Sequence, residues 1–163
     1  MTAPSDPSTW TLPRLAIDTD GAWLAEGVEV THPGILANLR SNLRQDDAGA
    51  YLQVGSVRVP VDLADTPYVV VRVEMADAGA TVILNDLSRE PLDLDTLAFG
   101  PGDIPYCRVL DGRFEARFSR GAAWELLQHV EHDPETGATD LVLPGLRRPI
   151  PAVDRPRRSR PAP

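Results

Sequence analysis

The sequence contains no lysine, so all sixteen of its basic residues are arginines. Without lysine, the chain can form neither a phosphate-binding loop of the GxxxxGK[ST] type nor a Schiff base with a substrate or cofactor. The GxGxxG fingerprint and the GxSxG and cysteine signatures of activated nucleophiles are also missing. We therefore expect no cofactor, no metal and no catalytic residue. The sequence does not decide whether the protein is an enzyme, although it favours a protein that is not one.

Cysteine and long apolar runs are also scarce. The single cysteine, Cys107, cannot form an intrachain disulfide, which favours a reducing cytoplasm. No stretch approaches the roughly 20 apolar residues that a membrane-spanning helix needs, so we expect no membrane insertion. The first residues lack the cationic and apolar parts of a secretory signal. The sequence thus predicts a soluble, cytoplasmic protein.

The pattern along the 163 residues predicts an α+β fold, made mostly of antiparallel strands and hairpins with two amphipathic helices. We expect a disordered leader over residues 1–14 and an N-terminal mixed α+β lobe over residues 15–66. A β-rich lobe with a C-terminal helix and hairpin should follow over residues 67–150, packed as one unit. Residues 151–163 read as a basic, disordered tail.

Charge is unevenly distributed along the chain. Residues 144–163 contain six arginines and one acid, Asp154, so this segment carries +5 of a total net charge of -8 and the rest carries -13. Such an acidic body repels nucleic-acid phosphates. The sequence therefore argues against nucleic-acid binding, except through the arginine-rich tail, which is either a solvated end or a contact arm for an acidic surface.

In the N-terminal half, turn chemistry predicts two hairpins and a helix. Gly21 permits a tight turn between Ile17 and residues 22–24, and Gly55-Ser56 forms a two-residue loop that pairs Val54 with Val57 and Leu52 with Val59. Thr31 can cap a helix with Pro33 in its first turn. The helix would bury one stripe and end in a loop over residues 44–50; the stripe is Ile35, Leu36, Leu39 and Leu43.

In the C-terminal half, hairpins again dominate. The run TPYVVVRVEM should turn back through residues 77–79, and residues 85–105 read as a crossing loop. Asp111-Gly112 is the strongest turn signal, and it sets Cys107 opposite Ala116 in the core, where the thiol is inert packing. A last hairpin should turn at Pro144-Gly145.

The stretch RFEARFSRGAAWELLQHVEHD raises the question of a metal site. Ser119 should cap a helix whose buried stripe is Ala123, Leu126, Leu127 and Val130 and whose opposite face holds Glu125, Gln128, His129 and His132. Glu125 with His129 and His132 could hold a transition metal, but no second element supplies another ligand, so a solvated face is favoured. His32 reads as a polar cap or surface residue, and Asp18 with Asp20 as a turn.

The candidate binding residues are Tyr106, Arg108 and Arg117. The predicted register turns them outward together with Arg113 and Glu115, with Tyr106 across from Arg117 and Arg108 across from Glu115. A cation-π stack and an ion pair would explain this cluster structurally. The other interpretation is recognition of an anionic or planar partner.

The order of these elements resembles a bacterial family catalogued as domain of unknown function 1285. The resemblance spans about residues 15–150 and rests on IDTDGAW, on Gly27 before the helix, on TPYVVVRVE and on YCRVLDGRFEARFSRGAAWEL. It implies a compact α+β fold with a small mixed lobe and a β-rich roll. The family has no established activity, so the resemblance implies no functional residue.

Taken together, the sequence favours a non-enzymatic binding or interaction module whose partner is an unidentified protein or a small anionic ligand. The alternative is a small-molecule or anion-binding sensor, or an enzyme that uses Asp, Glu and Arg in a cleft between the lobes. A homodimer is left open.

Overall fold

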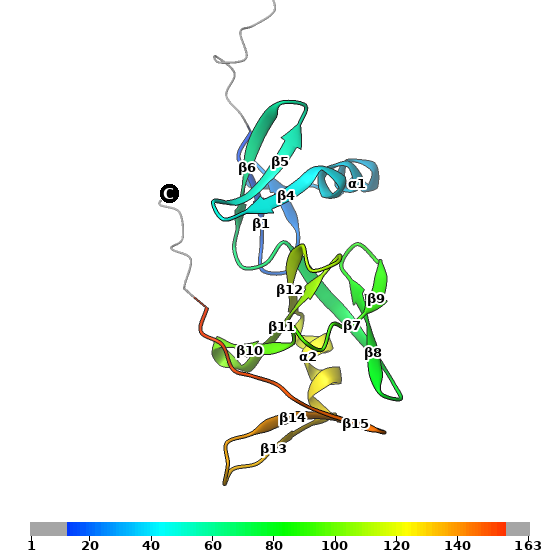
Figure 1. The fold of residues 1–163 in the computed structure, drawn as a ribbon. Coiled ribbons are helices and arrows are strands. Elements are labelled where there is room, and N and C mark those ends of the chain that lie inside the picture. Colours follow the sequence, from blue (N-terminus) through cyan, green and yellow to red (C-terminus); the bar gives the residue numbers. More distant parts are fainter. Residues whose placement is uncertain (1–12, 156–163) are drawn as a thin grey trace, which may run out of the picture. The chain divides into compact units, whose positions relative to one another are not determined.

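The computed structural model describes residues 13–155, which form two compact units (Figure 1). Residues 13–18 and 22–63 make the first unit, and residues 19–21 and 64–155 make the second. Almost all of the predicted leader lies outside the described residues. The same is true of the predicted tail from residue 156 onward. No helix within residues 13–155 is long and apolar enough to cross a membrane.

The first unit is built on one sheet with the order β3-β2-β1-β6-β5-β4, in which β1 and β6 run parallel and the other neighbours antiparallel. Its elements are β1 (Leu15–Ile17), β2 (Trp23–Ala25), β3 (Val28–Glu29), α1 (Pro33–Asn42), β4 (Leu43–Asp46), β5 (Gly49–Val54) and β6 (Val57–Leu63). Large apolar side chains fill its core, among them Ile17, Trp23, Leu43 and Leu52.

Both predicted hairpins of this unit are confirmed, with Ile17 paired to Trp23 in one and Leu52 to Val59 in the other. The predicted loop over residues 44–50 is wrong, because β4 begins directly after α1 and pairs with β5. This strand has little apolar alternation of its own, and its pairing with β5 provides the ordering that its sequence does not signal.

Helix α1 departs from the prediction at both ends. His32, not Thr31, is its N-cap: the His32 Nδ1 accepts hydrogen bonds from the backbone N–H groups of Gly34 and Ile35, at 3.1 and 3.3 Å. The predicted buried stripe does not form, since Ile35 is 52% exposed and Leu43 is buried as the first residue of β4. The helix therefore contributes little to the core of this unit.

The second unit contains a six-stranded sheet with the order β10-β11-β12-β7-β8-β9, in which β12 and β7 run parallel and the other neighbours antiparallel. Helix α2 packs against β7 and β12, and a three-stranded sheet, β13-β14-β15, follows it. The elements are β7 (Tyr68–Ala76), β8 (Gly79–Leu84), β9 (Arg89–Pro91), β10 (Ala98–Gly100), the 3₁₀ helix η2 (Pro101–Asp103), β11 (Ile104–Val109), β12 (Phe114–Phe118), α2 (Arg120–Leu127), β13 (Val130–His132), β14 (Thr139–Leu143) and β15 (Leu146–Pro149).

Three predicted hairpins of this unit, β7-β8, β11-β12 and β14-β15, are confirmed. The register of β11 with β12 is the predicted one throughout, and its core side is buried as expected at Cys107, Val109, Phe114, Ala116 and Phe118. The loop expected over residues 85–105 instead contains β9 and β10, which form the two edges of the six-stranded sheet. The fold class is confirmed: the protein is α+β, with mostly antiparallel strands.

Helix α2 starts as predicted, because the Ser119 hydroxyl accepts a hydrogen bond from the backbone N–H of Ala122. The helix ends at Leu127, however, so His129 follows it and His132 lies on β13. The prediction of one polar helical face holding Glu125, His129 and His132 is therefore wrong. The predicted buried stripe holds at Leu126 but not at Leu127, which is 41% exposed.

The C-terminal segment, residues 150–155, runs along β10 (Figure 1, in red). The Phe99 N–H donates to the Pro151 carbonyl at 2.9 Å, and the Val153 N–H donates to the Phe99 carbonyl at 2.8 Å. Ala152 thereby forms a parallel bridge with Phe99. Residues 151–155, expected to belong to the tail, thus have a defined path that ends at Arg155.

Adjacent leucines of α2 provide a test of this packing. Leu126 has no exposed surface, so Leu126→Ala should lower the free energy of unfolding by about 2–5 kcal/mol through lost burial and a cavity. Leu127→Ala should lower it by less than about 1 kcal/mol. Urea denaturation followed by circular dichroism measures both; equal losses for the two variants would contradict the described orientation of α2.

Candidate functional site

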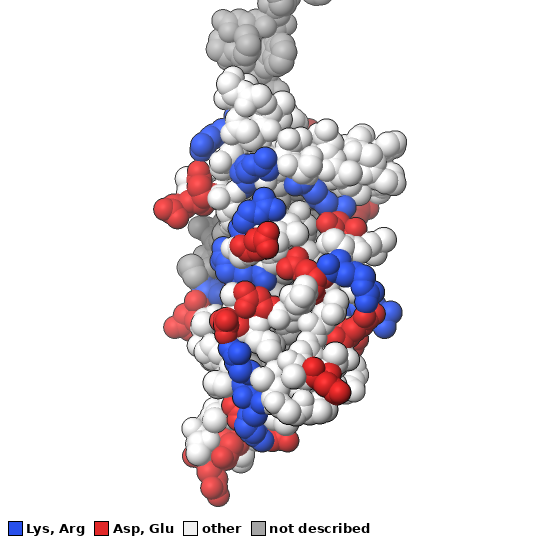
Figure 2. Space-filling model, turned by 45° about the vertical axis from the view of Figure 1, so that its right-hand side comes forward, with Lys and Arg blue, Asp and Glu red and all other residues white. Residues whose placement is uncertain are grey.

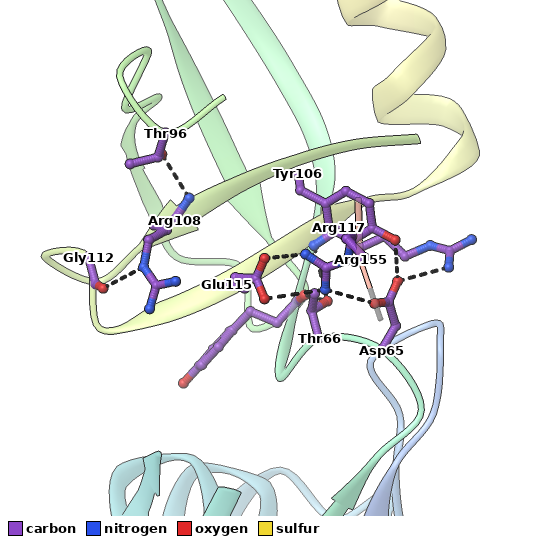
Figure 3. A network of polar contacts seen from close by, with 10 residues as sticks. Asp65, Thr66, Thr96, Tyr106, Arg108, Gly112, Glu115, Arg117 and Arg155 are labelled. Carbon is purple, nitrogen blue, oxygen red and sulfur yellow. Dashed lines mark hydrogen bonds and ion pairs between the residues drawn. The ribbon is translucent and has the colours of Figure 1, made fainter. Parts of the chain in front are cut away.

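The outer face of the β11-β12 hairpin carries a connected set of polar side chains, shown in Figure 3. Tyr106 and Arg117 are cross-strand partners on this face, and so are Arg108 and Glu115. Asp65 and Arg155 join them from distant parts of the chain. We call the set that these contacts connect the Asp65 network; its members are Asp65, Tyr106, Glu115, Arg117 and Arg155.

Asp65 reaches this face because the loop between β6 and β7 is fixed to β12 by its neighbour, Thr66. The Thr66 side chain is 1% exposed; its hydroxyl donates to the Tyr68 carbonyl at 2.6 Å and accepts from the Arg117 N–H at 3.1 Å. A buried hydroxyl with both a donor and an acceptor partner holds its backbone in one position. Asp65 is therefore fixed beside the end of β12.

The Asp65 carboxylate is the centre of the network. Its Oδ2 accepts from the Tyr106 hydroxyl at 2.6 Å and from the Arg117 guanidinium at 3.1 Å, and its Oδ1 accepts from the Arg155 guanidinium at 3.0 Å. One carboxylate thus connects β11, β12 and the C-terminal segment. Hydrogen bonds between ionised partners are the stronger kind, and these lie in a largely buried position.

Arg155 makes the most contacts of any member. Its guanidinium carbon lies 3.8 Å from the centroid of the Tyr106 ring, and its two terminal nitrogens bind both oxygens of Glu115. Burial opposes the charged form, but the hydrogen bonds to Glu115 and the charges of Glu115 and Asp65 outweigh it, so the pKa of Arg155 is raised. Arg155 therefore stays a cation in this setting.

Tyr106 is only 6% exposed, although the sequence placed it on an outward face. Burial, followed by the hydrogen bond to Asp65 and the charge of Asp65, raises the pKa of Tyr106 to about 12. The hydroxyl is therefore protonated at neutral pH. It acts as a hydrogen-bond donor to Asp65 and not as a general base.

The Asp65 network lines an open hollow of about 650 Å³, whose wall also includes Arg108 and the end of the C-terminal segment. Arg108 stands apart from the network (Figure 3): its Nε donates to the Gly112 carbonyl at 2.9 Å, and its backbone N–H donates to the Thr96 hydroxyl at 2.9 Å. Within the described chain it forms no ion pair. Arg108 is thus a cation in the wall of the hollow that has no ion-pair partner among the described residues.

Two of the three predicted binding residues, Tyr106 and Arg117, are brought together, but the predicted contacts are wrong. The cation that stacks on Tyr106 is Arg155, not Arg117, and the cation that pairs with Glu115 is Arg155, not Arg108. The sequence analysis missed the roles of Asp65 and Arg155. One signal was present: the face held more arginines than acids, so a carboxylate from elsewhere was needed to balance it.

The remaining sequence candidates lie elsewhere. Cys107 is buried on the core side of β11, and burial raises the pKa of its thiol to about 12, which removes the thiolate at neutral pH. The His132 Nδ1 lies 2.8 Å from the Thr139 hydroxyl, and the Asp18 carboxylate accepts from the Ala22 N–H in a turn. Among residues 13–155, no three His, Cys, Asp or Glu side chains are grouped as metal ligands would be.

Basic and acidic side chains alternate on the face shown in Figure 2, and neither sign forms a large separate patch there. Among the described residues, exposed ion pairs include those of Arg147 with Asp140 and Glu131 on the three-stranded sheet. Exposed pairs contribute little stability and no preference for a partner of one sign. The less exposed Asp65 network differs from them by its burial and its aromatic component.

The fold and the network describe an α+β protein of mostly antiparallel sheets with a polar hollow on one hairpin. Comparison with solved structures finds this fold in a DUF1285 family protein from Silicibacter pomeroyi, with a TM-score of 0.68 and 23% identity over 92% of this chain and 88% of that one. A DUF1285 family protein from Shewanella baltica matches with a TM-score of 0.59 and 18% identity over 71% of this chain and 91% of that one.

No protein-family model matches the sequence, and no curated protein does. The resemblance to the DUF1285 family that the sequence indicated is thus confirmed in the fold. Identities this low say nothing about which residues act. A shared fold alone does not define a function, which depends on the side chains that the fold brings together.

The raised pKa of Tyr106 is directly measurable. The tyrosine ζ-carbon chemical shift should titrate near pH 12 in the native protein, against an ordinary value of 10. Because the proton is held more tightly in the folded state, the associated stabilisation is complete below pH 10 and is lost as the pH rises from 10 through 12.

Asp65→Asn removes the charged acceptor and should lower the Tyr106 pKa, while burial keeps it above 10. The Tyr106→Phe variant identifies the Tyr106 ζ-carbon signal, because that signal is lost in its spectrum. A Tyr106 midpoint at 10 in the unsubstituted protein would show that the hydroxyl is neither buried nor bound to Asp65.

Proposed function

We propose that the protein is a non-enzymatic binding module that holds its partner on the outer face of the β11-β12 hairpin. The observation that carries this proposal is the Asp65 network itself: paired charges and a stacked aromatic ring line an open hollow instead of being filled over by apolar packing. Buried ionic clusters contribute little net stability compared with apolar packing, so their presence at an open surface favours recognition.

The charge arrangement favours a protein partner over the small anionic ligand that the sequence also allowed. Arg117 and Arg155 already pair with Asp65 and Glu115, so Arg108 is the one arginine among the described lining residues of the hollow that has no ion pair. Arg108 at its edge is the available cation, suited to a carboxylate on a partner surface. A partner that presents groups of both signs fits these positions. The sensor or enzyme acting between the lobes stays a prediction.

We also propose a bacterial and cytoplasmic setting. Both proteins that share the fold come from bacteria, which supports the first part. The buried, unreactive thiol of Cys107 is compatible with a reducing compartment and requires no disulfide partner. Whether the module acts as a homodimer stays a prediction.

A peptide-display selection against the immobilised full-length protein tests the binding role. Selected ligands should shift backbone amide NMR signals of β11 and β12. Arg108→Glu should weaken their binding by about tenfold, because a repulsive charge replaces an attractive one at the edge of the interface. Fluorescence polarisation measures the affinities.

Arg72→Glu is the matched control, since Arg72 is an exposed arginine on β7 of the same sheet and has no ion pair among the described residues. It should leave binding unchanged within about twofold. Ligands that contact other surfaces, or a catalytic turnover that survives alanine at Tyr106, Arg108 and Arg117, would refute the proposal.

A further inference from the structure

We infer that Asp65, Tyr106 and Glu115, in the wall of the hollow, form a recognition site for an arginine side chain on an extended partner segment, and that Arg155 occupies this site within the chain. The inference rests on the proposed function, because it names what the outer face of the β11-β12 hairpin binds. Without a bound partner, the chain's own C-terminal segment would then fill the site that the partner segment would otherwise bind.

The side chains around Arg155 match each part of a guanidinium group. The Tyr106 ring covers one flat face at 3.8 Å, Glu115 takes the two terminal nitrogens, and Asp65 takes one of them a second time at 3.0 Å. Stacking on a ring combined with forked hydrogen bonding to carboxylates is the interaction for which a guanidinium is suited and an ammonium is not. The site therefore distinguishes arginine from lysine.

The backbone of β10 leaves room for this stack. A Cβ atom on Gly100 would lie 2.5 Å from the Tyr106 Cε2 and 2.9 Å from the Arg155 Cδ, closer than side-chain atoms can approach. The φ of Gly100 is -91°, which any residue can adopt, so the glycine is not required by the backbone. A side chain at this position would not fit, because the Tyr106 ring and the aliphatic part of Arg155 lie against the Gly100 backbone.

The charges around the hollow need a cation from outside the sheet. Without Arg155, Asp65 would keep Arg117 and Tyr106, but Glu115 would lose both of its side-chain hydrogen bonds within the described residues. A partly buried carboxylate without a partner is unfavourable. The site vacated by Arg155 would therefore attract another guanidinium and repel an anion.

From Pro151 to Arg155, the C-terminal segment is attached by two backbone hydrogen bonds and by the Arg155 side chain. Two backbone hydrogen bonds to Phe99 place it beside β10, while the side chains from Pro151 to Asp154 are exposed and Arg155 reaches inward. Addition of an extended peptide to a sheet edge, with one side chain entering a pocket, is a known recognition mode. A partner segment that carries an arginine can follow the same path only by displacing Arg155.

The full-length Arg155→Ala variant tests this inference with N-acetyl-arginine methylamide as the probe. The probe should shift the amide NMR signals of Tyr106, Glu115 and Gly100, and it should bind this variant at least about tenfold more tightly than the unsubstituted chain, in which Arg155 competes for the site. N-acetyl-lysine methylamide should bind at least about tenfold more weakly than the arginine probe.

Two further variants make the test specific. Arg58→Ala is the matched control: Arg58 also stacks on a tyrosine, Tyr51, and pairs with one carboxylate, Asp46, but at an exposed position of the first unit. It should gain no affinity for the probe. Glu115→Gln in the Arg155→Ala background removes the forked acceptor at nearly constant volume and should abolish the gained binding.

A thermal-shift measurement keeps the test decisive if Arg155→Ala loses stability. The arginine probe should raise the melting temperature of Arg155→Ala and leave that of Arg58→Ala unchanged. The inference is overturned if Arg155→Ala does not bind the probe, if the unsubstituted chain binds it equally well, or if binding survives Glu115→Gln. If display-selected ligands still depend on Arg108 in that case, the proposed binding role is retained and only the preference for arginine is rejected.

Discussion

The hydroxyl of Thr66 is the constraint on which the candidate site depends. The hydroxyl donates to the Tyr68 carbonyl and accepts from the Arg117 N–H, and so it fixes the loop that precedes β7 against β12. Strands β7 and β12 run parallel and are far apart in sequence. Asp65 is held at the end of β12 as a consequence. Without that fixed position, Tyr106, Arg117 and Arg155 would have no shared acceptor, and the outer face of the hairpin would carry separate exposed charges.

The Asp65 network also shows how one set of contacts can serve both folding and recognition. Each cation in it pairs with a carboxylate: removal of Arg155 leaves Glu115, and removal of Asp65 leaves Arg117, without an ion pair among the described residues. The member that comes from the C-terminal segment is the one that a partner can replace. Arg117, by contrast, belongs to β12 and is paired through its backbone as well as its side chain.

Local hairpins were predictable from the sequence because the turn residues set the register. Asp111-Gly112 fixed every pair from Val109 with Phe114 to Tyr106 with Arg117, and Gly55-Ser56 did the same for β5 with β6. Nonlocal features were not predictable. The parallel pairing of β12 with β7 has no local signal, since the two strands are distant in the chain. The edge strands β9 and β10 pair with neighbouring strands, but each is only three residues long and lies among turn-forming residues, so neither shows a strand pattern of its own.

The site was half predictable for the same reason. Tyr106 and Arg117 follow from a hairpin register, whereas Asp65 arrives through the parallel pairing and Arg155 through a stretch whose proline and arginine content reads as a linker. The helix that was expected to align His129 and His132 ended early at Leu127, which no stop signal in WELLQHVEHD announces.

The NMR signal of the Arg155 guanidinium shows whether this side chain is stacked on Tyr106 in solution. Protons above an aromatic face are shielded, so the Arg155 Nε–H and δ-methylene resonances should lie upfield of those of the exposed Arg147 and should move back in Tyr106→Leu. Exchange with solvent should also be slower at Arg155 than at Arg147. Resonances of Arg155 that match those of Arg147 in position and exchange rate would mean that Arg155 is not held between Tyr106, Glu115 and Asp65.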